Sequence, residues 1–155
     1  MLGIIKKVNI ILFSGLPVIS SPLLACPDMQ GSYNTENNGT QIYLHNNGLQ
    51  KLNAVIDIPG HPLQAKTAVF VSEEDRNAQP YQGLPECTLS IDGFGYLLPH
   101  MKGKIFRLHF DSQDYEKVFN TDYILKLSDI PAENIGVNKT ASTIPDKALT
   151  ALNKH

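Results

Sequence analysis

Apolar and polar residues alternate with a period of two along most of the chain between residues 31 and 128. In one run, Leu63, Ala65, Thr67, Val69 and Val71 alternate with Gln64, Lys66, Ala68, Phe70 and Ser72. This spacing is typical of a β-strand, whose successive side chains point to opposite faces of a sheet. Similar short runs cover residues 31–35, 40–45, 49–58, 87–91, 94–98, 105–110 and 123–128. The pattern therefore predicts an all-β protein with about eight short strands.

Turn-forming dipeptides separate several of these runs. Asn38-Gly39, Asn47-Gly48 and Asp92-Gly93 favour tight hairpins, because their residues tolerate a positive φ. Tight turns join neighbouring strands in antiparallel pairs, and regular spacing of short strands is typical of a sandwich or barrel. We expect an antiparallel meander that closes into a small barrel or sandwich. The barrel is favoured because closure removes exposed strand edges.

The start of the first predicted strand resembles that of the lipocalins. In that family a glycine and an aromatic residue lie two positions apart, as Gly31 and Tyr33 do here. This chain has Tyr where the family usually has Trp, and the resemblance covers residues 27–33 alone. It supports a barrel and does not assign the chain to the family.

The alternation stops after Pro131. Residues 132–143 are polar and irregular, and Pro145-Asp146 predicts the start of a short helix. The apolar stripe of this helix comprises Ala148, Leu149, Ala151 and Leu152. We divide the chain into a targeting segment (1–25), a β-barrel or sandwich domain (26–131) and an irregular tail with a short helix (132–155).

The first 25 residues have the layout of a secretory signal peptide. Lys6 and Lys7 form a basic region, residues 8–19 are mostly apolar, and residues 20–25 are mostly small. The apolar run is shorter than the roughly 20 residues that span a bilayer. We therefore expect export to a bacterial periplasm or to the exterior, with no integral membrane span in the mature chain.

Cys26 has two possible fates. Leu23-Leu24-Ala25-Cys26 resembles a bacterial lipobox, in which the cysteine receives a lipid and anchors the protein to the outer membrane. Alternatively, Cys26 pairs with Cys87, the only other cysteine, as cysteines of exported proteins usually do. The two fates exclude each other because both use the same thiol. We favour the Cys26–Cys87 disulfide, with lipidation of Cys26 as the alternative.

Composition excludes several classes of protein. The chain has 155 residues, which suffices for one domain, and 42% of them are hydrophobic, enough for one core. Charged residues make up 18% and the net charge is −2. Loss of residues 1–25 removes two lysines and no acidic residue, which takes the net charge from −2 to −4. Nucleic acid is therefore not an expected partner.

No motif for catalysis, a metal or a cofactor stands out. The chain lacks a Gly-x-Ser-x-Gly elbow and a dinucleotide-binding fingerprint. The histidines before the C-terminus, His45, His61, His100 and His109, are not spaced as metal ligands. We therefore predict no catalytic residues, no metal site and no cofactor, and favour a non-enzymatic role.

These observations leave three functions open. We favour a non-catalytic envelope or secreted binding module, for a small apolar ligand or a protein partner that it inhibits. The alternatives are a structural or assembly accessory of the envelope, and a small hydrolase or metal-dependent enzyme. The loop 73–86 is the predicted recognition element, together with the turns at 46–48 and 99–103. Within it, Arg76 and Tyr81 are residue types enriched at binding hot spots. A roomy, apolar interior favours a small ligand, and a filled interior together with an exposed Tyr-rich loop face favours a protein partner.

Overall fold

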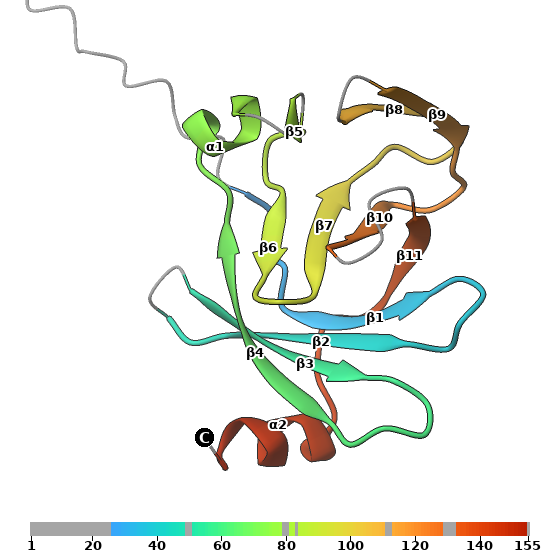
Figure 1. Cartoon of the computed structure of the whole chain (residues 1–155). Coiled ribbons are helices and arrows are strands. Elements are labelled where there is room, and N and C mark those ends of the chain that lie inside the picture. The colour runs from blue at the N-terminus through green and yellow to red at the C-terminus, as the bar shows by residue number, and fades with distance from the viewer. Residues whose placement is uncertain are drawn as a thin grey trace, which may run out of the picture.

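The computed structural model describes residues 26–48, 51–78, 81–82, 84–110, 113–128 and 133–154, so the predicted signal peptide lies outside the described residues. Its main feature is a closed antiparallel barrel (Figure 1). The barrel strands are β1 (Gly31–Thr35), β2 (Gln41–Asn46), β3 (Leu52–Asp57), β4 (Gln64–Phe70), β6 (Leu89–Ile91), β7 (Gly95–Pro99), β10 (Tyr123–Leu127) and β11 (Asn134–Ala141). Each strand pairs with the next, and β11 returns to β1. The predicted meander barrel is confirmed.

A smaller sheet lies outside the barrel. It consists of β5 (Tyr81–Gln82), β8 (Ile105–Phe110) and β9 (Gln113–Val118), in the order β5-β8-β9. Phe106 and Leu108 of β8 pack on Leu98 and Ile124, which point outward from β7 and β10. The β8–β9 hairpin thus lies at one side of the barrel, opposite the C-terminal helix (Figure 1). Among the described residues, no helix has the length and apolar character needed to cross a bilayer.

The loop between β1 and β2 is longer than the two-residue turn predicted from Asn38-Gly39. It covers residues 36–40, with positive φ at Asn37 and Gly39. The Asn38 side chain explains the difference, because its Oδ1 accepts a hydrogen bond from the Thr40 N–H at 3.0 Å and another from the Thr35 hydroxyl. Such an Asx turn replaces the tighter hairpin.

The alternation in β4 does not reveal which face is buried. Val69, from the set with more β-branched residues, is 42% exposed. Ala68 is fully buried in the barrel core, and Phe70 packs against that core. The small sheet and the C-terminal helix cover parts of the outer barrel wall, so apolar residues occur on both faces of its strands.

The segment after Pro131 corrects the predicted irregular tail. Residues 134–141 form β11, which pairs with β1 on one side and β10 on the other. The residues here carry no clear strand signal, because Asn134, Gly136 and Asn138 have low β-propensity and only Ile135 and Val137 alternate with them as apolar residues. Gly136 permits close packing, since a Cβ atom there would lie 2.9 Å from the Thr121 side chain.

The predicted C-terminal helix is confirmed as α2 (Asp146–Leu152). It packs against the outer face of the barrel, where Ala148 is buried with Tyr43 and Val55. Lys147 Nζ lies 2.6 Å from Asp57 Oδ2 and joins the helix to the end of β3. The helix therefore adds an external apolar cluster to the barrel, separate from the one under the small sheet.

Candidate recognition surface

Side chains fill the barrel interior. They form one apolar cluster, and several of them, including Ile42, Leu97 and Leu125, have no exposed surface. The buried members of the cluster are Met29, Tyr33, Ile42, Leu44, Leu52, Ala54, Ile56, Ala68, Leu89, Ile91, Leu97, Leu125, Ile135 and Val137. A ligand-binding barrel instead keeps an apolar cavity at its centre. The arrangement is that of a packed core.

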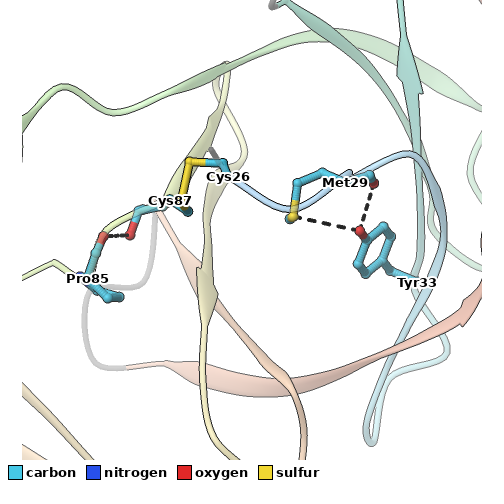
Figure 2. Close-up of a disulfide and its surroundings, with 6 residues drawn as sticks. Cys26, Met29, Tyr33, Pro85 and Cys87 are labelled. Atoms are coloured by element: carbon cyan, nitrogen blue, oxygen red, sulfur yellow. Dashed lines mark hydrogen bonds between the residues drawn. A yellow bond between two sulfur atoms is a disulfide. The ribbon is translucent and has the colours of Figure 1, made fainter. Parts of the chain in front are cut away.

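The segment Cys26–Gln30 leads into the barrel core and is fastened there. Met29 is 1% exposed, and the Tyr33 hydroxyl donates a hydrogen bond to its carbonyl oxygen at 2.7 Å (Figure 2). Cys26 forms the predicted disulfide with Cys87, the two Cα atoms lying 5.4 Å apart. Cys87 has φ of 62°, a left-handed conformation that non-glycine residues rarely adopt. The bridge thus ties the N-terminal segment to the connection that precedes β6.

Tyr33 occupies an unusual electrostatic environment. Its ring contacts that of Tyr123 edge-on at a centroid distance of 5.3 Å, and Lys139 Nζ lies 5.7 Å from its centroid. Burial raises the pKa of the Tyr33 hydroxyl far above its ordinary value, and the charges of Tyr123 and Asp28 add to this effect. Burial also raises the pKa of Tyr123. Both phenols thus favour the neutral form in the folded protein.

We predict a loss of stability in alkaline solution that depends on Tyr33. Above about pH 10 the unfolded chain releases phenol protons that the folded chain retains, so the free energy of unfolding falls by up to about 1.4 kcal/mol per pH unit for each such tyrosine. Lys126 has the opposite effect on the free energy of unfolding, because burial lowers its pKa. Its contribution to stability rises with pH only up to the ordinary lysine pKa and is constant above it. Urea unfolding of Tyr33→Phe at several pH values should give a shallower alkaline decline. An unchanged slope contradicts the assignment.

The predicted loop 73–86 contains ordered structure. Residues Glu73–Asn77 form helix α1, whose N-cap Ser72 accepts a hydrogen bond from the Asp75 N–H at 3.2 Å. Arg76 lies on α1, half-buried, and its Nε is a buried donor that bonds to no acceptor in the described part of the chain. Tyr81 lies in β5, where its backbone pairs with that of Phe110. Its side chain is outside the described part of the structure. The structure therefore places Tyr81 beside β8 and Arg76 on a helix that contacts β5.

The three connections proposed for recognition are only partly brought together. They all follow strands that end on the same side of the meander, because alternate connections of an up-and-down barrel share one end. Pro85 and the turn 99–103 line a common hollow of about 720 Å³. Asn46 lines a different hollow of about 280 Å³, beside Cys26 and Met29. The three connections thus share one end of the barrel but do not line one common hollow.

The described residues contain no group of three His, Cys, Asp or Glu side chains placed to hold a metal ion. His109 Nδ1 lies 2.7 Å from Asp114 Oδ1 on the exposed side of the β8–β9 hairpin. His100 Nε2 lies 3.1 Å from the Lys104 carbonyl oxygen. These contacts hold the hairpin and its preceding turn, and they place no base beside a candidate nucleophile.

Sequence reasoning did not identify a further, largely polar hollow, which we call the β9 hollow. It has a volume of about 630 Å³ and lies between the β8–β9 hairpin and the barrel. Its lining comprises Glu36, Asn37, Asn38, Phe106, residues 115–120 and residues 133–136. The two walls are far apart in sequence, and β11 was not expected to be a strand, so no local pattern could have indicated it.

No protein-family model matches the sequence, and neither the curated proteins nor the solved structures include a significant match.

Proposed function

We propose that the protein is an exported, non-catalytic binding module that recognises a protein partner through its outer surface. The filled barrel interior is the main support for this proposal. Tyr33, Met29 and Leu97 occupy the space that a small apolar ligand needs. Recognition therefore falls to the loops, the small sheet and the hollows around them.

Export is part of the proposal. A disulfide persists in oxidising compartments such as the periplasm or the exterior, and the signal-like residues 1–25 precede Cys26 directly. Intact-mass analysis of the native protein should show loss of about these residues and a gain of two hydrogens on reduction. A mass increased by a diacylglycerol group supports the lipid-anchored alternative and contradicts the bridge at Cys26.

Exposed apolar residues on the small sheet support a protein as the partner. Met101 is 66% exposed, Val118 is 52% exposed and Ile105 is 49% exposed. Ile105 and Val118 are cross-strand partners in the β8–β9 hairpin, and Met101 lies in the turn that precedes it. Methionine and aromatic residues are enriched at protein interfaces.

Site-specific photo-crosslinking in intact cells tests the proposal. A benzoylphenylalanine at position 101 or 118 should cross-link to a discrete partner protein, which purified protein should then bind. The same group at Thr150, which is exposed on α2, is the control and should give no such product. Absence of a product at both test positions contradicts the proposal, as does a turnover that depends on a histidine or carboxylate.

A further inference from the structure

Strand β9 forms an open edge of the small sheet. It pairs with β8 on one side, and no described strand pairs with its other side. The Phe119 carbonyl oxygen points toward the β8 side, where it accepts a hydrogen bond from the Gly103 N–H at 2.8 Å. Because backbone groups alternate between the two sides of a strand, Asp114, Glu116 and Val118 direct their N–H and C=O groups to the open edge. A row of backbone N–H and C=O groups at an open edge is a template for the addition of another strand.

The β9 hollow follows this edge. Its lining includes Tyr115, Glu116, Lys117 and Val118 in succession. Consecutive residues of a strand point to opposite faces, so a hollow that touches all of them lies along the edge of the strand. The opposite wall comes from the β1–β2 loop and the start of β11. An added strand would therefore lie between the hairpin and the barrel.

The charges around the hollow favour a basic occupant. Glu36 and Glu133 are exposed, and neither forms an ion pair within the described residues. Glu116 is paired with Arg107 at 3.0 Å, and Lys117 lies over the Phe119 ring at 4.9 Å. Within the described part of the chain, the hollow thus presents two carboxylates without a cationic partner, to which basic side chains of an occupant are complementary.

We infer that the β9 hollow binds an extended, basic peptide segment of the partner as a strand added to β9. This inference rests on the proposed function. A second copy of the chain fits less well, because its β9 carries Lys117 as its single basic residue and offers no excess of basic side chains to Glu36 and Glu133. The backbone of β9 would supply affinity, and the carboxylates of Glu36 and Glu133 would select the charge of the segment.

Titration of the full chain, purified in its disulfide-bonded form, tests the inference. The probe is an eight-residue capped peptide in which Lys alternates with Val or Thr. Binding is measured at low salt from the amide NMR shifts of the protein. We expect a dissociation constant on the order of 100 µM. The shifts should concentrate at Asp114, Glu116 and Val118 and in residues 36–38. A matched peptide with Glu in place of Lys should bind at least tenfold more weakly. Equal binding of both peptides, or shifts confined to other surfaces, overturns the inference.

Two sets of variants separate the backbone from the charge. Glu116→Pro removes an N–H that faces the hollow while β8 keeps its hydrogen bonds, and should weaken peptide binding at least tenfold. Glu116→Gln keeps that N–H and should change binding less than threefold. The double variant Glu36→Lys/Glu133→Lys should also weaken binding at least tenfold. Glu73→Lys/Glu74→Lys on α1 is its charge-matched control and should bind as the unmodified protein does. Binding that is insensitive to Glu116→Pro overturns strand addition, provided the amide spectrum shows an intact fold.

The cross-linking and peptide-binding results together distinguish a failure of this inference from a failure of the proposed function. Cross-links in cells at position 101 but none at position 118, together with no peptide binding, overturn strand addition and leave a protein-binding role elsewhere. Dimers that form at micromolar concentration and disappear with Glu116→Pro overturn the basic peptide in favour of a second copy.

Discussion

Removal of the Cys26–Cys87 bridge is expected to lower the free energy of unfolding by about 4 kcal/mol, as a cross-link over a loop of this size does in the chain-entropy model. The cysteines are 61 positions apart, so the bridge greatly restricts the unfolded chain. It also holds the segment that places Met29 in the core. The variant Cys26→Ser/Cys87→Ser leaves no unpaired thiol, and urea unfolding at pH 7 measures its stability.

Chemical reduction provides the control for this prediction. A reductant should destabilise the unmodified protein by a similar amount and should leave the double variant unchanged. A loss below about 1 kcal/mol in the variant contradicts the role assigned to the bridge, because disulfides in small domains typically contribute 2–4 kcal/mol.

The second large effect is expected for Leu97→Ala, at about 2–5 kcal/mol of lost stability. Leu97 lies on β7 with no exposed surface, within the cluster that fills the barrel. Its truncation removes apolar contacts and leaves a cavity, because the hydrogen-bonded barrel wall is unable to collapse fully around the gap. Thermal or urea unfolding of the oxidised variant measures the loss.

Val69→Ala is the matched control for Leu97→Ala. Val69 also lies on a barrel strand, but it is 42% exposed and points away from the core. Its truncation should change stability by no more than about 0.5–1 kcal/mol. Equal losses in the two variants contradict the assignment of Leu97 to a packed interior.

Local patterns predicted the parts of the fold that alternate clearly and have one buried face. In β2, Ile42 and Leu44 point into the barrel as expected, and the helix after Pro145 buries Ala148. The disulfide followed from the number of cysteines. The buried face of β4 was not predictable, since both alternating sets of its residues carry apolar side chains, with Ala68 in the core and Val69 exposed.

The candidate site was less predictable than the barrel. The β9 hollow combines the edge of a hairpin with the β1–β2 loop and the start of β11, where Asn134 and Gly136 gave no strand signal. The predicted residues Arg76 and Tyr81 lie on α1 and β5, outside the β9 hollow, and their part in recognition stays a prediction. Residue type alone indicated them, and residue type does not report which elements meet in space.

Titration with an apolar fluorophore such as N-phenylnaphthylamine tests most directly whether recognition takes place outside a filled barrel. The oxidised full chain should show no saturable one-to-one binding. The cavity variant Leu97→Ala provides a comparison in which interior space has been created. Saturable one-to-one binding by the unmodified protein, abolished by Leu97→Phe, would contradict the account and establish a small-ligand site inside the barrel.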